Sequence, residues 1–394
     1  MLRFILLLLL TTFVYANDTQ ELSDSRSFEE FLTDIRTQAL DKGISKTTLD
    51  KAFDNLKPNP RVIKFDRTQA EFSQNFWRYL SSRVSEYRLK KGAEKLKQHQ
   101  QELQENYKKY GVPPHIIVAF WGMESNYGGN TGNLGLIRSL ATLGFDKRRS
   151  EFFTEQLLSL LELIDKGKIP ISAKGSWAGA MGNVQFMPTN VAAYGVDADN
   201  DGKIDLWGND ADIFASAANF LEQIGWHRAE RWGREVSIPK DFDYQLANLN
   251  IRKTVNDWKL LGVRAADNKE LPTSDMQASI VLPMGYNGPA FFAYRNFRAI
   301  LRWNRSILYA LSVGHLSDRL TGINKLFTKP VVEPSLSRDD INNIQTTLNN
   351  LGFDTGEPDG ISGPKTREAT RKYQKSNNLP IDGYVGYQLL QQLQ

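Results

Sequence analysis

Apolar residues recur three or four positions apart along most of the chain, which is the spacing of one buried helix face. The pattern is clearest in four segments: SFEEFLTDIRTQAL (27–40), SKTTLDKAFDNL (45–56), SEFFTEQLLSLLELIDKG (150–167) and IFASAANFLEQIGW (213–226). Residues 72–110 are rich in Gln, Glu, Lys, Arg and Leu, a composition that favours long, partly exposed helices. The sequence therefore predicts a mainly helical protein.

One stretch departs from the helical pattern. Between Arg234 and Pro272 the segments EVSIP, YQLANLNIRKTV and GVRA have the character of short strands, which predicts a small β insertion. Helical spacing returns over residues 291–320. Residues 323–336 are Pro-containing and aperiodic, as a linker is, and residues 337–394 follow as a separate unit of three short helices joined by turn-rich loops. A core as small as that of residues 337–394 is typical of a binding module. The fold class expected for the whole chain is mainly α (α+β).

The N-terminus has the pattern of an export signal. Arg3 precedes the apolar run FILLLLLTTFV, and VYA ends at Ala16 with the small residue that a signal peptidase needs. The run is too short for a comfortable membrane span, and no other segment approaches that length. We expect residues 1–16 to be a signal peptide and the mature protein to be soluble and periplasmic. The alternative is a buried first helix.

Composition argues against several classes of protein. The 394 residues carry a formal net charge of +4, which gives no case for a nucleic-acid partner. The chain has no cysteine, so we expect no lipid anchor on an N-terminal Cys, no thiol nucleophile, no disulfide and no Cys-ligated zinc. The four histidines are scattered and neither HExxH nor GxSxG occurs, so metallohydrolase and serine-hydrolase chemistry lose their support.

A lone acid ends the most apolar helical segment. Residues 116–121 are apolar nearly all round, Glu124 follows them, and Asn126, Gly128 and Gly129 are residues that end helices. Desolvation and the negative end of the helix dipole both raise the pKa of such a carboxyl group. No Lys or Arg lies within six residues before it or thirteen after it to lower that pKa. Glu124 is therefore suited to be a general acid; the alternative is a Glu in solvent at a frayed helix end.

Three ordered motifs carry a resemblance to a known family. GVPPHIIVAFWGMESNYGGNTG, LATLGFDKRRSEFF and KGSWAGAMGNVQFMP together resemble the membrane-bound lytic transglycosylase B family, a lysozyme-like group that cuts peptidoglycan, and the match covers residues 28–320. The resemblance implies a lysozyme-like helical catalytic domain over residues 27–322. It also implies that Glu124, in the motif GMESNYG, is the single catalytic acid and base.

The resemblance also implies a set of substrate-binding residues. The double arginine of the family's groove corresponds to Arg148 and Arg149, whose guanidinium groups can hold lactyl or peptide carboxylates. The other positions expected to reach the substrate are Ser176, Gln185, Phe186, Phe220, Trp303, Asn304 and Tyr309. Many members carry Tyr where this chain has Phe220 and Trp303, which puts a direct hydrogen bond in doubt at both. Without the resemblance, the arginines would be an ordinary solvated charge pair and AGAMG would indicate close helix packing.

The chemistry that the resemblance implies needs one acid, whereas most glycosidases use two. Glu124 protonates the glycosidic oxygen between N-acetylmuramic acid (MurNAc) and N-acetylglucosamine (GlcNAc), and the N-acetyl group can stabilise the anomeric carbon. Glu124 then takes the proton of the C6 hydroxyl, which closes a 1,6-anhydro ring without water and without a cofactor. Two alternatives remain: a hydrolytic muramidase on the same fold, and an inactive scaffold that only binds peptidoglycan. The expected partner is the peptidoglycan strand, bound by a monomer.

A candidate metal site lies in the segment DADNDGKIDLWG, which begins like the calcium loop of an EF-hand. Three aspartates take its first, third and fifth positions, but Gly208 stands at the twelfth, where the motif has a bidentate Glu. Asp212, at the start of the next helix, could replace that Glu. The expected ligands of a structural calcium ion are Asp197, Asp199, Asp201, Lys203 and Asp212. The alternative is an Asp-rich surface turn.

The last unit of the chain carries a second resemblance. Residues 341–393 resemble the peptidoglycan-binding type 1 domain along its whole length, through two DG turns, GPKT and YQ. The Asp residues of the DG pairs, Asp359 and Asp382, are expected to form turns rather than to bind metal. A binding domain tethered to a catalytic domain raises the local concentration of substrate without adding contacts to the bond being cut.

Overall fold

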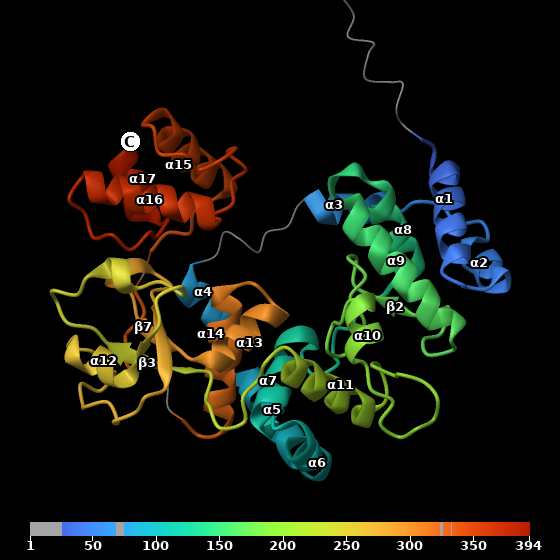
Figure 1. The fold of residues 1–394 in the computed structure, drawn as a ribbon, viewed down its shortest axis with the longest axis horizontal. Helices are drawn as coiled ribbons and strands as arrows, with labels where there is room; N and C mark the ends of the chain where they lie inside the picture. The colour runs from blue at the N-terminus through green and yellow to red at the C-terminus, as the bar shows by residue number, and fades with distance from the viewer. Residues whose placement is uncertain (1–25, 68–74, 324–325, 332) are drawn as a thin grey trace, which may run out of the picture.

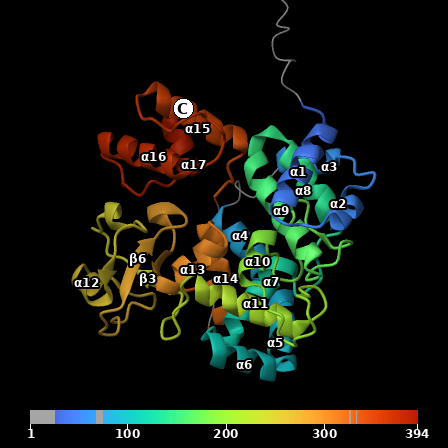
Figure 2. The ribbon, with the colours of Figure 1, turned by 45° about the vertical axis from the view of Figure 1, so that its right-hand side comes forward.

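In a computed structural model of the chain, residues 26–67, 75–323, 326–331 and 333–394 are described. The expected signal peptide, residues 1–16, lies outside these ranges. The described chain is mainly helical with one five-stranded sheet and one pair of very short strands, which confirms the predicted fold class (Figures 1 and 2). Within the same ranges, no helix combines the length and the apolar character that a membrane crossing requires.

Five helices form the lobe on the right of Figure 1. They are α1 (Phe28–Asp41), α2 (Lys46–Phe53), α3 (Pro60–Arg67), α8 (Leu136–Phe145) and α9 (Ser150–Asp165), with the 3₁₀ helix η2 (Lys147–Arg149) before α9. Local sequence explains where the first begins, because Ser27 and Glu30 form a capping box: Ser27 Oγ accepts from the Glu30 N–H at 3.1 Å and Glu30 Oε2 from the Ser27 N–H at 2.6 Å. Helix α9 packs against α8, α1 and α2.

A second group of helices, within the described residues, packs on or near α7 (Pro114–Ser125). They are α4 (Phe76–Arg83), α5 (Glu86–Gln98), α6 (Gln100–Tyr110), α7 (Pro114–Ser125), α10 (Pro188–Tyr194), α11 (Asp210–Gln223), α13 (Arg295–Trp303) and α14 (Ile307–Leu320). Helix α7 packs against α5, α6, α11 and α14, which explains why its sequence is apolar on every side. The short strands β1 (Leu134–Gly135) and β2 (Lys174–Gly175) pair beside it.

The β insertion is an antiparallel five-stranded sheet of order β4-β6-β7-β3-β5. Its strands are β3 (Gly233–Ser237), β4 (Lys253–Thr254), β5 (Arg264–Ala265), β6 (Gln277–Val281) and β7 (Ala290–Ala293), with α12 (Val255–Leu260) and the 3₁₀ helices η3 (Tyr244–Leu246) and η4 (Gly285–Asn287) between them. The helix expected from residue 291 begins only at Arg295. The sequence AFFA is buried at every position in the middle strand, and such a short apolar run fits a buried strand as well as a helix.

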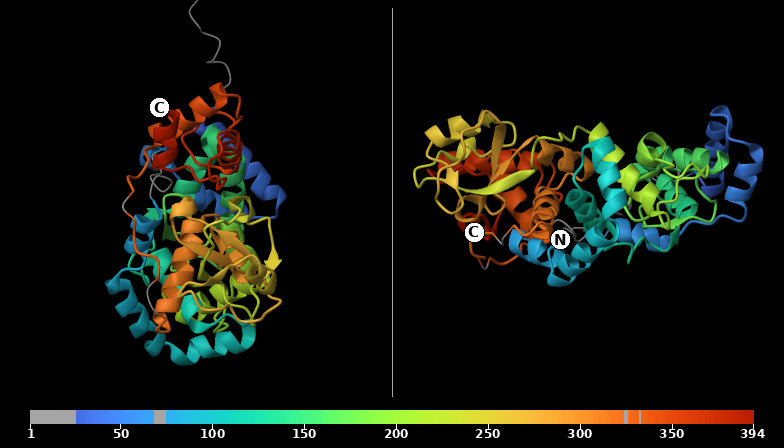
Figure 3. Two further views of the ribbon diagram at one scale, coloured as in Figure 1. Left: turned by 90° about the vertical axis from the view of Figure 1, so that its left-hand side faces the viewer. Right: turned by 90° about the horizontal axis from the view of Figure 1, so that it is seen from below.

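Three helices form the C-terminal unit: α15 (Arg338–Asn350), α16 (Pro364–Ser376) and α17 (Tyr387–Leu393). They enclose a core of their own, and the unit lies beside the sheet (Figure 3). Its two DG turns are built alike. Gln345 accepts the N–H of Gly360 at 2.8 Å and donates to Asp359 at 3.0 Å, while Gln374 accepts the N–H of Gly383 at 2.9 Å and donates to Asp382 at 2.7 Å. Both Asp side chains thus serve turn geometry, as the sequence predicts.

Candidate active site

Helix α7 carries Glu124 on its last turn. The helix ends because Asn126 adopts a left-handed conformation (φ 53°), and its N–H and that of Tyr127 bond back to the carbonyls of Gly122 and Trp121 at 3.2 and 3.3 Å. Glu124 is half-buried, whereas residues 116–123 before it are buried. The expected placement of the acid, at the exit of a buried helix, is therefore what the structure shows.

Two side chains donate hydrogen bonds to the same oxygen of Glu124. The indole Nε1–H of Trp303, the last residue of α13, donates to Oε1 at 2.8 Å, and the Tyr309 hydroxyl, from the first turn of α14, donates to it as well. Burial, followed by the nearby Glu124 carboxylate, raises the pKa of Tyr309 well above its ordinary value, so this phenol keeps its proton and remains a donor. Donors to a carboxylate favour its charged form, an effect that the sequence argument for Glu124 left out.

The hydrogen bond at position 303 is therefore made, although the sequence put it in doubt. An indole N–H takes the place of a phenol O–H, and it can donate but never accept. Phe220, the second departure from the family pattern, has no polar group to offer. Its ring packs against Trp303 with the centroids 5.0 Å apart.

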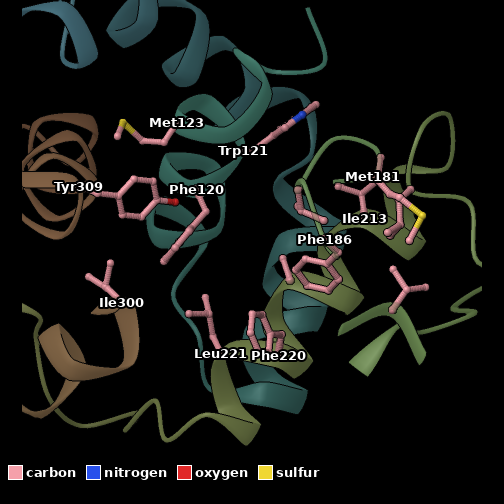
Figure 4. Close-up of a cluster of buried hydrophobic side chains, with 14 of the residues drawn as sticks. Phe120, Trp121, Met123, Met181, Phe186, Ile213, Phe220, Leu221, Ile300 and Tyr309 are labelled. Carbon is pink, nitrogen blue, oxygen red and sulfur yellow. The ribbon is translucent and has the colours of Figure 1, made fainter. Parts of the chain in front are cut away.

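Three aromatic rings pack against Trp303. Phe120 lies 4.3 Å and Phe186 lies 5.3 Å from its ring, centroid to centroid. Phe186 is 1% exposed and Phe220 is 5% exposed, so both rings are enclosed by protein (Figure 4). We infer that these two residues hold Trp303 in place rather than present a face to a sugar.

Hydrogen bonds of its own side chains hold the loop from Ser176 to Met187 in shape. Ser176 Oγ accepts the N–H of Ala180 at 2.9 Å, and Gln185, in a left-handed conformation (φ 50°), donates its amide to the carbonyls of Gly182 at 2.8 Å and Thr131 at 3.2 Å. These bonds use the amide N–H₂ of Gln185 and leave its Oε1 to accept from a ligand. A Cβ at Gly179 would lie 2.3 Å from Leu140, so close packing explains that glycine.

Buried Asn183, which the sequence analysis did not single out, ties this loop to α7. Its Oδ1 accepts from the indole of Trp121 at 2.6 Å, and its Nδ2 donates to the carbonyls of Leu206 and Trp207 at 3.1 and 2.9 Å. The sequence signal that could have identified Asn183 is its position inside the motif GAMGNVQFMP. Asn304, at the end of α13, is half-buried directly after Trp303.

The two arginines differ in their contacts. Arg148 makes two hydrogen bonds to Asp66 of α3, Nε to Oδ2 at 2.8 Å and the second between Nη2 and Oδ1. The Asp66 side chain is 1% exposed, and Arg67 also pairs with it at 3.2 Å. Arg149 is exposed and lies over the rings of Phe152 and Phe153, 4.7 and 4.9 Å from their centroids. Asp66 therefore already holds the Arg148 fork that was expected to grip a substrate carboxylate.

Three of the four aspartates expected to bind metal come together. Carboxylate oxygens of Asp197, Asp199 and Asp212 lie within 4.8 Å of one another, whereas Asp201 is not part of this group and accepts the N–H of Lys203 at 2.8 Å. Asp212 is fully buried, and burial is the main cause that raises its pKa, with Asp199 and Asp197 adding to the effect and backbone donors opposing it. Asp197 Oδ1 is buried without a hydrogen-bond partner. Such a donor set, with an orphaned carboxylate oxygen, suits a hard cation such as Ca²⁺.

The chain is similar to several known proteins. Residues 27–318 match the transglycosylase SLT domain family and residues 337–393 match the peptidoglycan binding domain family. Membrane-bound lytic murein transglycosylase B of Escherichia coli is 31% identical over 249 residues, which cover 61% of this chain and 66% of that protein's length.

Solved structures of related proteins are also similar to this chain. SltB3 of Pseudomonas aeruginosa, in complex with NAG-anhNAM-pentapeptide, is 44% identical with a TM-score of 0.89, over 93% of this chain and 99% of that one. Escherichia coli lytic transglycosylase Slt35, in complex with calcium, is 27% identical with a TM-score of 0.64, over 76% of this chain and 94% of that one.

Proposed function

The chain belongs to the transglycosylase SLT domain family, and from that premise we propose that it is a lytic murein transglycosylase with Glu124 as its acid and base. The bond cut is the β-1,4 linkage from MurNAc to GlcNAc, and the product carries a 1,6-anhydro-MurNAc end. The observation that carries the proposal is the paired donation of Trp303 and Tyr309 to one oxygen of Glu124.

Because of these two hydrogen bonds, the two carboxylate oxygens of Glu124 have different roles. Because Oε1 already accepts two hydrogen bonds, the proton of the acid form belongs on Oε2. Tyr309 and Trp303 remain in contact with Oε1 whether the group is acid or carboxylate. They therefore stabilise the negative charge that appears on Glu124 when it gives its proton away.

The proposed reaction has two proton transfers. Glu124 donates its proton to the glycosidic oxygen as the bond from that oxygen to C1 of MurNAc breaks, and the GlcNAc part leaves as an alcohol. The N-acetyl oxygen stabilises C1, the C6 hydroxyl oxygen then bonds to C1, and its proton returns to Glu124. The acid is regenerated and water takes no part, so one carboxyl group is sufficient where most glycosidases need two.

The other parts of the site have supporting roles in this proposal. Ser176, Gln185 and Asn304 offer hydroxyl and amide groups that suit sugar hydroxyls and N-acetyl groups. Gln185 donates to the carbonyl of Thr131, seven residues after Glu124, and Asn304 directly follows Trp303, which donates to Glu124. Both arginines are exposed, but Asp66 of α3 holds Arg148, so Arg149 is the better candidate for a stem-peptide carboxylate. Residues 27–322 would form the catalytic domain, residues 323–336 the linker and residues 337–394 a peptidoglycan-binding domain that acts as a tether.

We also propose a structural calcium ion at Asp197, Asp199 and Asp212. These are the residues of the acidic loop that the structure brings together, and the related Slt35 was solved with calcium. When bound, the ion would neutralise the crowded carboxylates and so stabilise the loop beside α11. Export to the periplasm and a monomeric state remain predictions.

The role of Glu124 is tested by replacing it with Gln, with Glu151→Gln as the matched control. Glu151 is an exposed acid at the start of α9, close in sequence to the double arginine. Glu124→Gln should lower muropeptide release from purified sacculi by at least about 100-fold, since it removes the proton donor. Glu151→Gln should release muropeptides at the normal rate. Substantial cleavage by Glu124→Gln would refute the assignment, and loss of cleavage in Glu151→Gln would indicate a two-acid hydrolase.

A further inference from the structure

The backbone makes a left-handed turn directly after Glu124. Asn126, Tyr127 and Gly128 have φ values of 53°, 60° and 80°. Elsewhere in the described residues, positive φ values occur at single positions only. L-residues avoid such runs because the Cβ crowds the following carbonyl oxygen, and a bulky side chain in this region is uncommon. Asn and Gly tolerate the conformation, so the residue that needs an explanation is Tyr127.

The Tyr127 side chain folds back against the helix that it follows. It is 5% exposed, and its ring meets that of Trp121 edge-on with the centroids 5.7 Å apart. The contact with the helix backbone is close, because a Cβ at Gly122 would lie 2.6 Å from the ring carbon Cζ of Tyr127. Tyr127 therefore packs on the residues of α7 that come just before Glu124.

A hydrogen bond fixes this ring at its far end. The Tyr127 hydroxyl donates to the carbonyl of Arg88 in α5 at 2.8 Å, and burial raises the pKa of Tyr127 well above its ordinary value, so the phenol keeps its proton. The space around the hydroxyl is closed, since a Cβ at Gly92 of α5 would lie 2.4 Å from its oxygen. The bond joins the turn after Glu124 to a neighbouring helix at one defined place.

The donors to Glu124 come from other elements. Trp303 of α13 and Tyr309 of α14 both donate to its Oε1, and they can do so together only while the last turn of α7 holds the carboxylate in place. A left-handed backbone that costs free energy persists only where the surrounding contacts impose it. The hydrogen bond from Tyr127 to α5 is such a contact.

We propose that Tyr127 is a positioning residue for the reaction: its hydroxyl holds the turn that presents Glu124 to Trp303 and Tyr309. The inference rests on the proposed function, which makes Glu124 the acid. Tyr127 acts through the backbone and without touching the substrate. Its loss should therefore change the rate of the chemical step more than the binding of the glycan.

Tyr127→Phe deletes the hydroxyl and keeps the ring. In muropeptide release from soluble glycan strands, kcat should fall about tenfold with little change in KM, because a small displacement of Glu124 loosens both hydrogen bonds to Oε1. The alkaline limb of the pH profile should move to higher pH, since those bonds favour the carboxylate. Ser279→Ala is the matched control. It deletes a buried hydroxyl that donates to the carbonyl of Ile251 at 2.6 Å in the β insertion, and it should keep the normal kcat and pH profile.

A double-mutant cycle separates positioning from a general loss of stability. In a chain that already carries Trp303→Phe, one of the two bonds to Oε1 is gone, so Tyr127→Phe should lower kcat by a smaller factor than it does in the unsubstituted chain. A change that only weakens the fold would lower kcat by the same factor in both. Gly92→Ala is a second variant. Its Cβ would displace the Tyr127 hydroxyl from the α5 side, so it should move the pH profile in the same direction.

Three results would overturn the inference: a kcat and pH profile of Tyr127→Phe that match those of the control, equal losses in the two backgrounds, or a Gly92→Ala variant that behaves like the unsubstituted chain. Glu124→Gln is assayed alongside these variants. Substantial cleavage by Glu124→Gln contradicts the proposed function. Loss of cleavage in Glu124→Gln, together with normal cleavage by Tyr127→Phe, contradicts only the positioning role.

Discussion

Replacing Trp303 by Phe removes one donor from Glu124 while an aromatic ring remains in the cluster. The lost bond, Nε1 to Oε1 at 2.8 Å, is a hydrogen bond to a charged group, worth about 1.5–3 kcal/mol when it is made. Tyr309 still donates to the same oxygen, so we take the lower end of that range. A loss of about 1.5 kcal/mol corresponds to roughly a tenfold change in an equilibrium constant or a rate.

The sign follows from which form the donor stabilises. Trp303 favours the carboxylate, so its loss favours the protonated acid, and the alkaline limb of the pH profile should move to higher pH. Without Trp303, the negative charge that forms on Glu124 when it donates its proton is less well stabilised. We therefore expect kcat to fall about tenfold with little change in KM. The assay is the rate of muropeptide release from soluble glycan strands across a pH series.

Trp258→Phe is the matched control for that experiment. Its indole donates to the carbonyl of Ala278 at 3.0 Å in the core of the β insertion, so it loses the same group far from the acid. This variant should lose stability and keep the pH profile of the unsubstituted protein. An alkaline limb that stays in place in Trp303→Phe, or that moves to lower pH, would refute the reasoning.

Three further predictions concern stability. Asp66→Asn should destabilise the protein by about 2–4 kcal/mol in urea unfolding, since it leaves Arg148 without its buried partner; an unchanged midpoint would contradict this role. Burial, with Arg319 adding to it, lowers the pKa of His315 to about 4, so stability should be full above the ordinary histidine value and fall by roughly 3 kcal/mol toward pH 4. His315→Leu should flatten that slope, and an equally steep slope would show that other groups cause it. Saturating calcium should raise Tm relative to chelator, and Asp212→Asn should remove the rise; a rise that persists in the variant would exclude this site.

The sequence predicted the elements whose signals are local. A run of apolar residues followed by a single acid and by Asn and Gly predicts where α7 ends, and the structure agrees. Ser45 likewise begins α2 by accepting the N–H of Thr48 at 3.2 Å. The C-terminal helices followed from the same kind of evidence.

The resemblance placed Trp303 and Tyr309 in the site, but their hydrogen bonds to Glu124 could not be predicted from sequence patterns, because the residues are remote in sequence. Trp303 and Tyr309 lie 179 and 185 positions from Glu124, and Asp66 lies 82 positions from Arg148. No periodicity links such residues, and only the packing of α14 on α7, of α13 on α14 and of α3 on α8 brings them together. Dependence on distant neighbours also explains why the sequence did not predict strand β7. Its short apolar run fits a helix as well as a strand, and its pairing with β6 and β3 decides between them.

Mass spectrometry of the muropeptides released from sacculi tests the central claim most directly. If Glu124 acts as both acid and base and water takes no part, every new MurNAc end made by the unsubstituted protein is a 1,6-anhydro-MurNAc, lighter by one water molecule than a reducing end. Release in water enriched with heavy oxygen should then leave those ends unlabelled. Reducing ends that carry the heavy isotope would contradict the account and show a hydrolase.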